Sequence, residues 1–230
     1  MENKDTIYTR TEMMLGQDAV NKLKAAHVAV FGVGGVGGFT TEALARAGIG
    51  RLTLIDADRV AVSNINRQII ATHSTVGTYK TEAMRDRIRD INPECEVRVY
   101  NEFYSEDNPI PLDGIDYVAD CIDSVNSKLY LISEASALGI DIISSMGAGN
   151  KLDPTRFIVA DISKTHTDPL AKVIRTELRK RGINHLKVVF SDEPPINQSG
   201  ERTPGSVSFV PSVVGLIIAG EIIKDIIKKQ

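Results

Sequence analysis

The stretch VAVFGVGGVGGFTTEALARAGIGRLTLID, residues 28–56, decides the fold that we expect for this chain. An apolar run at residues 28–31 leads into a glycine-rich turn, a helical pattern follows as far as Gly48, and a second apolar run ends at Asp56. This order predicts a strand, a turn, a helix and a parallel strand, which together form one βαβ unit. We therefore expect an α/β fold, Rossmann-like and doubly wound, with a mainly parallel sheet and helices on both faces.

The turn of this unit has the composition of a phosphate-binding loop. Its glycines are Gly32, Gly34, Gly35, Gly37 and Gly38, of which the first four are the candidates for binding the ligand. Glycine lets the backbone turn sharply and approach a phosphate with no Cβ in the way, and the following helix then points its N–H groups at that phosphate. Asp56 lies 19 residues beyond Gly37, where such folds place an acid that accepts the ribose hydroxyls. The pattern favours an adenosine-containing ligand, while glycines that serve only tight packing remain the alternative.

Length and composition are those of an ordinary globular protein. The 230 residues suit one α/β domain, with 25% charged and 42% apolar residues. Two cysteines, Cys95 and Cys121, exclude a disulfide framework and a four-cysteine zinc site, so no zinc is expected. Cys121 ends an apolar run, which favours a small buried hydrophobe over a nucleophile.

The sequence favours a cytoplasmic protein without a membrane partner. Residues 1–10 are polar and lack the apolar core of a signal peptide. The longest apolar stretch, residues 209–227, is interrupted at helical spacing by Glu221, Lys224 and Asp225. This pattern is typical of an amphipathic helix rather than of a membrane span.

A polar loop after Asp56 is the next candidate for binding chemistry. It reads VSNINRQ at residues 62–68, and Lys80 opens a helical pattern that Asn92-Pro93 ends. A triphosphate needs cations where pyrophosphate charge develops, and Arg67 offers a planar fork while Lys80 offers a point charge. The candidate nucleotide-binding residues of this region are Asp56, Asp58, Asn64, Arg67, Gln68 and Lys80. A purely structural pairing of Arg67 with Asp58 remains an alternative.

A third candidate position follows the strand expected at residues 115–121. Its end reads DCIDS, at the carboxyl edge where open parallel sheets bind ligands. Asp123 is placed to hold a magnesium ion against phosphate oxygens. Alternatively, Asp123 caps the helix expected at residues 125–138.

Residues 151–187 carry an excess of positive charge. Nine Lys and Arg side chains and four Asp and Glu side chains give a local charge of +5, and because the net charge is −3, the rest of the chain carries −8. A partner that carries phosphates could use this segment, although a solvated helix face fits the charges equally well. The candidate contacts to such a partner are Lys151, Arg156, Lys164, Lys172, Arg175, Arg179 and Lys180.

Within this basic segment a helix is expected at residues 169–181, with Asp168 as its N-cap and Pro169 as its first residue. Its expected apolar stripe consists of Leu170, Val173, Ile174 and Leu178. Strand-like runs at 156–162 and 186–190 flank it and extend the sheet, in our interpretation as an antiparallel addition in the C-terminal half.

The expected organisation is a single domain over residues 1–230. Residues 1–150 form a nucleotide-binding half, 151–210 a basic substrate segment with a mobile loop at 192–206, and 211–228 a closing helix. The apolar stripe of that last helix exceeds what one small domain needs, which favours a homodimer. The stripe consists of Val214, Ile217, Ile218, Ile222 and Ile226.

Taken together, the glycine turn, Asp56, the SNINRQ loop, Lys80 and the DCID strand end resemble the adenylating family of ThiF, MoeB and the ubiquitin-activating enzymes. The resemblance covers residues 7–150 and the last helix. It implies that Asp56 binds the ribose, that Asn64, Arg67 and Lys80 bind the phosphates of ATP, and that Asp123 holds Mg²⁺. It further implies that Arg10, otherwise a plain surface arginine, reaches ATP from the partner subunit of a homodimer. Such enzymes join a carboxylate to AMP and release pyrophosphate.

The second half narrows this resemblance. The chain lacks the CxxC pairs usual in ThiF and MoeB and the cysteine domain of ubiquitin-activating enzymes, whereas residues 147–183 are similar to the tRNA threonylcarbamoyladenosine dehydratases. This implies that ATP activates the carboxylate of threonylcarbamoyladenosine, next to the tRNA anticodon, and that the ring closes with loss of water. An intramolecular nucleophile removes the need for a cysteine thioester.

Two other function classes stay open at this point. One is an activator of a ubiquitin-like or sulfur-carrier protein, which the missing zinc cysteines disfavour. The other is a nucleotide-binding redox or regulatory protein, which Arg67 and Lys80 disfavour. Whether a sulfur-transfer protein assists as a further partner is left open.

Overall fold

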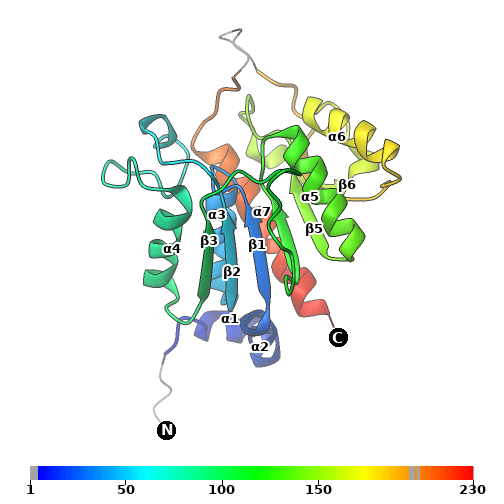
Figure 1. The fold of residues 1–230 in the computed structure, drawn as a ribbon. Helices are drawn as coiled ribbons and strands as arrows, with labels where there is room; N and C mark the ends of the chain where they lie inside the picture. The colour runs from blue at the N-terminus through cyan, green and yellow to red at the C-terminus, as the bar shows by residue number, and fades with distance from the viewer. Residues whose placement is uncertain (1–4, 197–199, 201–202, 230) are drawn as a thin grey trace.

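The computed structural model describes residues 5–196, 200 and 203–229. Their centre is a seven-stranded sheet in the order β3-β2-β1-β4-β5-β7-β6 (Figure 1). The strands are β1 His27–Phe31, β2 Arg51–Ile55, β3 Glu96–Tyr100, β4 Tyr117–Asp120, β5 Asp141–Ser145, β6 Phe157–Asp161 and β7 Lys187–Ser191. Neighbouring strands are parallel except for β6, which runs antiparallel to β7. This confirms the doubly wound, mainly parallel sheet and its antiparallel extension.

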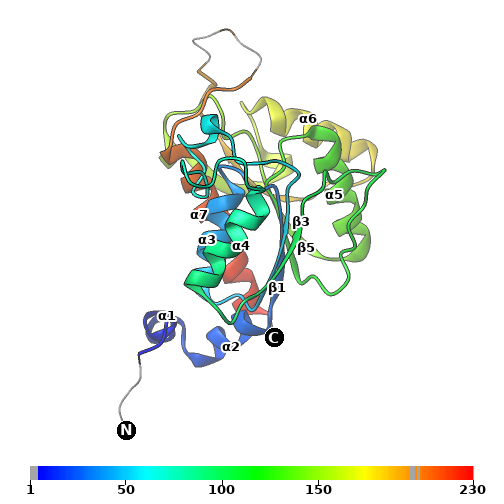
Figure 2. The ribbon, with the colours of Figure 1, turned by 60° about the vertical axis from the view of Figure 1, so that its left-hand side comes forward.

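Helices cover both faces of the sheet, as expected. They are α1 Thr9–Leu15, α2 Gln17–Ala25, α3 Gly37–Ala47, α4 Lys80–Ile91, α5 Val125–Leu138, α6 Pro169–Lys180 and α7 Phe209–Lys228. Short 3₁₀ turns occur at Val62–Asn64, Pro154–Arg156 and Ile162–Lys164. Seen close to edge-on, α3, α4 and α7 lie on one face and α5 and α6 on the other (Figure 2). Separate apolar clusters fill the two interfaces.

The order of the strands positions the site. The chain winds outward from β1 to β2 and β3, then returns to β4 beside β1 and continues in the other direction. The connections after β1 and β4 therefore diverge, which opens a crevice at the carboxyl ends of these two strands. In Figure 1 this edge is uppermost, and α1 and α2 lie at the opposite edge.

Local signals in the sequence set the ends of several helices. Helix α3 ends before Gly48, whose φ of 96° is the left-handed conformation that glycine adopts without strain. A Cβ there would also lie 2.7 Å from the ring of Tyr8. Helix α6 begins at Pro169, and the carboxylate of Asp168 accepts a hydrogen bond from the amide of Ala171 at 3.0 Å. Both signals were predicted from sequence.

The apolar stripe expected on α6 was partly wrong. Ala171, Ile174 and Leu178 are buried, whereas Val173 is 45% exposed. The buried face, packed toward α5, is rotated relative to the expected one because Ala171 rather than Val173 faces it.

The apolar stripe of helix α7 does not support the homodimer that was expected from it. Val214, Ile218, Ile222 and Ile226 are buried within the chain's own core, and Ile217 is half-buried. The helix packs closely on α3, since a Cβ at Gly215 would overlap the carbonyl oxygen of Val36. The stripe is therefore buried in the protomer's own core and gives no evidence for a dimer.

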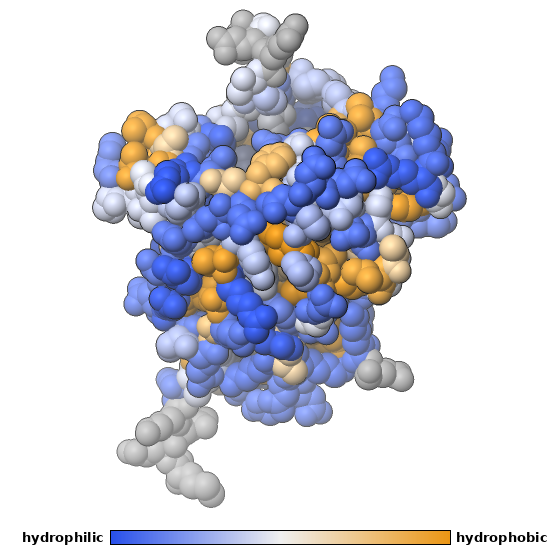
Figure 3. Space-filling view, in the orientation of Figure 1, coloured by the Kyte–Doolittle hydropathy of each residue, from blue (hydrophilic) through white to orange (hydrophobic). Residues whose placement is uncertain are grey.

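On the face shown in Figure 3 the surface is mostly hydrophilic, and hydrophilic residues divide the apolar patches. Among the helices of the described residues, none combines the length and the apolar character that a bilayer crossing requires.

Candidate functional site

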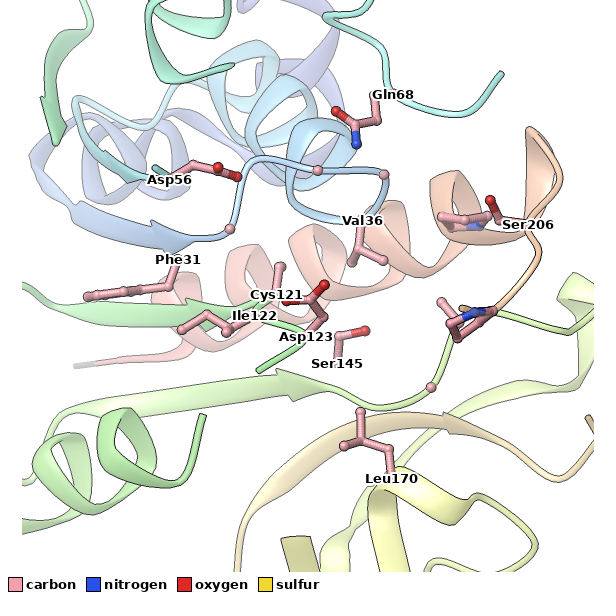
Figure 4. Close-up of a pocket in the computed structure, with 18 of the residues that line it drawn as sticks. Phe31, Val36, Asp56, Gln68, Cys121, Ile122, Asp123, Ser145, Leu170 and Ser206 are labelled. Carbon is pink, nitrogen blue, oxygen red and sulfur yellow. The ribbon is translucent and has the colours of Figure 1, made fainter. Parts of the chain in front are cut away.

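A cavity of about 840 Å³ opens at the carboxyl edge of the sheet (Figure 4). Residues that follow β1, β2, β4 and β5 form its walls, together with the 62–80 segment, the start of α6 and the approach to α7. It brings together most of the nucleotide-site residues predicted from sequence. Those that line it are Gly32, Gly34, Gly35, Asp56, Asp58, Asn64, Arg67, Gln68, Lys80 and Asp123.

The glycines of the turn have different roles. Gly32 has a φ of 86°, and a Cβ on it would lie 2.7 Å from the carbonyl oxygen of Cys121. A Cβ on Gly37, which does not line the cavity, would overlap the carbonyl oxygen of Gly32. These two glycines are required by the turn's own packing. At Gly34 the nearest atom to a Cβ is Nε2 of Gln68, at 3.7 Å, so this position leaves the backbone open to a ligand.

Asp56 both supports the turn and faces the cavity. Its Oδ2 accepts a hydrogen bond from the amide of Val33 at 2.8 Å, and its Oδ1 accepts one from the amide of Asp58 at 2.8 Å. Burial raises the pKa of Asp56 above its ordinary value, although nearby Lys80 and the two amides oppose this. Each carboxylate oxygen has a further lone pair, so ribose hydroxyls can still be accepted.

Lys80, the first residue of α4, is buried between two acids. Its Nζ lies 2.6 Å from Oδ2 of Asp58 and 3.9 Å from Oδ1 of Asp56. Asp58 is therefore paired with Lys80, and the alternative pairing of Arg67 with Asp58 was wrong. Arg67 instead donates hydrogen bonds from Nη1 to the carbonyl oxygen of Ser63 and to Oδ1 of Asn66. A guanidinium has five N–H donors, so Arg67 keeps donors for a phosphate.

Two other residues of the 62–68 loop behave differently. Oδ1 of Asn64 accepts a hydrogen bond from the amide of Ala61, which shapes the loop. Gln68 is buried, yet its Oε1 has no hydrogen-bond partner among the described residues. Its amide lies beside the glycine turn in Figure 4. A buried polar atom without a partner is costly, and together with the open backbone at Gly34 it fits a polar ligand such as a nucleotide.

Asp123 points into the cavity near Ser145 (Figure 4). Within the described residues its carboxylate makes no hydrogen bond, and Ser124, not Asp123, is the N-cap residue of α5. The alternative role of Asp123 as a helix cap was therefore wrong. Among all the residues that the structure describes, no group of three or more His, Cys, Asp or Glu side chains gathers as a metal site. A single carboxylate still fits Mg²⁺, which commonly takes one or two protein carboxylates beside phosphate oxygens and water.

Behind Asp123 lies a buried ion pair that sequence reasoning missed. Lys128 and Asp120 are both fully buried, with Nζ 2.8 Å from Oδ2. The hydroxyl of Ser144 donates to the same oxygen at 2.5 Å, and Oδ1 of Asp120 accepts from the amide of Ile122. This network holds the strand end from which Asp123 projects. The signal in the sequence was a lysine among the apolar residues of the helix expected at 125–138.

Neither cysteine is poised to act as a nucleophile. Burial raises the pKa of Cys121 to about 12 and that of Cys95 to about 11, so both thiols stay protonated near neutral pH. This supports the expectation that Cys121, which lines the cavity, serves as a small hydrophobe.

The candidate cations of residues 151–187 have different surroundings in the structure. Lys151 is buried in the cavity wall, where its Nζ donates to the carbonyl oxygen of Glu193, so it is not one of the solvent-exposed cations of this segment. Burial lowers its pKa, although Asp168 and Glu193 oppose this. Lys151 ends the segment 146–151 that follows β5, and this segment lines the cavity.

Several other cations of this segment are already paired. Nη1 of Arg175 donates to the carbonyl oxygen of Thr165 at 2.8 Å, and Arg156 pairs with Asp192 at 2.7 Å. Nζ of Lys180 lies 2.6 Å from Oε1 of Glu177. Among the described residues, the cations of the set that are exposed and have no ion pair are Lys164, Lys172 and Arg179. We call these three the free basic face.

Two predicted features lie away from the cavity or partly outside the described residues. Arg10 is exposed on α1, at the sheet edge opposite the cavity, so it does not join its own protomer's site (Figure 1). The loop predicted to be mobile at 192–206 includes residues 197–199 and 201–202, which are outside the described residues. Its described ends are hydrogen-bonded to the rest of the chain, through Ser206 to Asn66 and through Ile196 and Gly205 to Asn150.

A Rossmann-like sheet with an open glycine turn, a ribose-type acid and two cations at its switch point defines the class of nucleotide-binding α/β proteins. More particularly, residues 8–230 match the model of the ThiF family, and the chain belongs to that family. This confirms the resemblance seen in the sequence.

Three similar proteins match this chain over almost its whole length. It is 48% identical to a tRNA threonylcarbamoyladenosine dehydratase of Bacillus subtilis, over 96% of this chain and 94% of that protein. It is 38% identical to the dehydratase of Haemophilus influenzae, over 93% and 90%. The crystal structure of the Escherichia coli tRNA N6-threonylcarbamoyladenosine dehydratase in complex with ATP superposes with a TM-score of 0.88, at 38% identity over 95% and 93% of the two chains.

Proposed function

We propose that this chain is an ATP-dependent tRNA threonylcarbamoyladenosine dehydratase. It would close the side chain of N6-threonylcarbamoyladenosine, next to the tRNA anticodon, into a ring. The observation that carries this proposal is the single cavity lined by the glycine turn, Arg67, Lys80 and Asp123, in a chain 48% identical to a relative of that name. The E. coli homologue has also been seen with ATP and with AMP.

In the first step an oxygen of the threonyl carboxylate attacks the α-phosphorus of ATP, and the bond to the β-phosphate oxygen breaks. Arg67 and Lys80 stabilise the negative charge that develops on the departing pyrophosphate. Asp56 holds the ribose, and the open backbone at Gly34 admits the phosphates. We assign Mg²⁺ to Asp123, where the ion would neutralise phosphate charge.

In the second step an atom of the carbamoyl group attacks the acyl carbon, that group loses a proton, and AMP leaves. One carboxylate oxygen departs with AMP, so the substrate has lost the atoms of water. The attacking atom and the acyl carbon belong to one side chain, so the enzyme needs no thioester and mainly holds the two ends in contact. The protonated thiols of Cys95 and Cys121 accord with this route.

The same division of the chain is proposed as was expected from sequence. Residues 1–150 bind ATP, residues 151–210 contribute tRNA contacts, and α7 closes the core. The free basic face on and near α6 supports the tRNA role, because cations without partners can contact backbone phosphates. Since tRNA is the proposed substrate, the reaction is assigned to the cytoplasm and the enzyme to the ligase or cyclase type. Assistance by a sulfur-transfer protein stays an open prediction.

We further propose that the enzyme works as a homodimer in which Arg10 serves the neighbouring site. Helix α1 exposes Met13 by 74% and Met14 by 84%, which is unusual for large apolar side chains in solvent. Because Arg10 lies at the edge opposite its own cavity, only a second copy could receive it. Mixing inactive Arg10→Ala and Lys80→Ala proteins should restore activity, since some mixed dimers contain one intact site. An active monomer at working concentration would contradict this proposal.

The decisive experiment for the function is direct. The purified protein is incubated with ATP, Mg²⁺ and tRNA that carries threonylcarbamoyladenosine, and the nucleosides are analysed by mass spectrometry. We expect a nucleoside lighter by one water, with one AMP and one pyrophosphate formed per product. Absence of this product, together with pyrophosphate exchange that requires a sulfur-carrier protein, would instead favour the second candidate. That candidate rests on a 40% identity to a Drosophila yakuba adenylyltransferase and sulfurtransferase over only 51% of this chain.

A further inference from the structure

The nucleotide residues occupy only part of the cavity. Beyond Asp123 it continues between the end of β5, the start of α6 and the described ends of the 192–206 loop. We call this part the second compartment. Its apolar lining residues are Met146, Ala148, Leu170, Pro195 and Pro204. We propose that the second compartment binds the modified purine base itself, turned out of the anticodon loop, and that Asn150 holds the compartment's wall. This inference rests on the proposed function.

The covalent structure of the substrate requires the base to come close to ATP. Four bonds separate the carboxyl carbon of the threonyl group from N6 of the adenine. At ordinary bond lengths these bonds span roughly 5 Å when extended. A carboxylate in contact with the α-phosphate therefore brings the purine to the same cavity, and a base stacked inside the anticodon loop could not reach it.

The walls of the second compartment suit a flat, apolar ligand. Leu170 projects from the first turn of α6 into the cavity and faces Ser145 and Asp123 (Figure 4). Pro195 and Pro204 come from the two sides of the loop. Enzymes that act on a base commonly enclose it between aromatic or apolar side chains, which replace the stacking that the base has lost.

Asn150 fixes both sides of this loop at one point. Its backbone N–H donates to the carbonyl oxygen of Gly205 at 2.8 Å. Its side-chain Oδ1 accepts from the backbone N–H of Gly205 at 2.7 Å. Its carbonyl oxygen accepts from the amide of Ile196 at 2.7 Å. These bonds keep Pro195 and Pro204, the neighbours of Ile196 and Gly205, in the wall of the compartment.

Two backbone features make this arrangement specific to the residues present. Asn150 has a φ of 56°, a left-handed conformation that asparagine adopts more readily than most residues. A Cβ on the preceding Gly149 would lie 2.6 Å from Cβ of Pro204, so only glycine allows Pro204 to pack there. The wall is thus set by close contacts, not by the length of the loop.

The test compares binding of two anticodon stem-loop RNAs, one with threonylcarbamoyladenosine and one with unmodified adenosine. The wild-type protein should prefer the modified RNA. Leu170→Ala and Asn150→Gly should each reduce that preference and raise KM for modified tRNA by roughly tenfold. Asn150→Gly tolerates the left-handed backbone and keeps both main-chain bonds, so it removes only the bond to Oδ1. Affinity for unmodified RNA and for ATP should stay within about twofold.

Matched controls separate this role from a general loss of structure. Val173→Ala changes an exposed apolar residue of the same helix, and Asn184→Gly changes an exposed asparagine outside the cavity. Both should behave as wild type. Asn150→Asp retains an acceptor for the amide of Gly205 and should recover most of the preference. If both test variants fold and keep the wild-type preference and KM, the inference is overturned while the proposed function stands. If wild-type protein does not dehydrate the substrate at all, the proposed function itself is wrong.

Discussion

Nζ of Lys80 lies 2.6 Å from Oδ2 of Asp58, and the two side chains differ sharply in exposure. The Lys80 side chain is 8% exposed and that of Asp58 is 71% exposed. The buried cation cannot leave, whereas the carboxylate can rotate into solvent. When a triphosphate binds, its oxygens would therefore replace Asp58 as the partner of Lys80. The buried ammonium group of Lys80 would then remain paired throughout.

Substitution of Asp58 tests this exchange. Asp58→Asn should lower the stability of the nucleotide-free protein by at most about 1 kcal/mol, because the pair is largely exposed on one side. With ATP bound the loss should vanish, since phosphates then neutralise Lys80. The rise in Tm on adding ATP should thus be larger for the variant than for wild type. An equal loss of Tm with and without ATP would show that Asp58 remains the partner of Lys80 throughout.

Arg67→Ala and Lys80→Ala should reduce turnover by about 10²–10³ while weakening adenosine binding much less. The reason is that both cations act on charge that develops as pyrophosphate leaves. Pyrophosphate release and equilibrium binding of adenosine nucleotides measure the two effects. Arg59→Ala is the matched control, because Arg59 is exposed and stacks on Tyr79 outside the cavity lining. Losses confined to ground-state affinity would refute a transition-state role.

The free basic face should contribute tRNA affinity without contributing sequence specificity. The variant Lys164→Gln, Lys172→Gln, Arg179→Gln should bind all tRNAs more weakly, and its affinity should depend less on salt concentration. ATP affinity should be unchanged. The control removes equal charge elsewhere, by glutamine substitution on α4 and β3 of Arg85, Arg89 and Arg98. An unaltered salt slope would move the tRNA contacts to another surface.

A protein with Cys95→Ser and Cys121→Ala should still form the cyclic nucleoside at a rate close to wild type. Burial raises the pKa of these thiols to about 11 and about 12, so thiolate is scarce at neutral pH. Single-turnover assays and a thermal melt of the double variant provide the measurement. Lost cyclisation in a folded double variant would restore a covalent thioester to the mechanism.

Lys128→Met should destabilise the protein by about 3–5 kcal/mol, because it leaves the carboxylate of Asp120 buried without its cation. A double variant that also carries Asp120→Leu should recover part of that loss, since no charge then remains buried. Urea unfolding gives the free energies. A single variant as stable as wild type would mean that the pair contributes little and that Ser144 and the amide of Ile122 hold the strand end.

The sequence predicted the secondary structure closely where its signals act over a few residues. Helix α4 begins at Lys80 and ends before Asn92-Pro93, and α5 covers residues 125–138 as expected. Glycine, proline and capping residues determine such ends through local dihedral preferences and hydrogen bonds, which do not depend on the rest of the fold. The place of the site at the carboxyl edge of the sheet followed from the same information, since the carboxyl ends of parallel strands meet at one edge.

The partners of the charged residues could not be read from the sequence in this way. Lys80 pairs with Asp58, 22 positions away, Lys151 is buried against Glu193, and Arg175 is held by Thr165. Residue types and local periodicity alone determined the α/β fold, the glycine turn and the family motifs. Only the tertiary structure decided which cations are free, which face of α6 is buried and where the apolar stripe of α7 packs. These outcomes depend on how segments distant in the sequence pack together and exclude water.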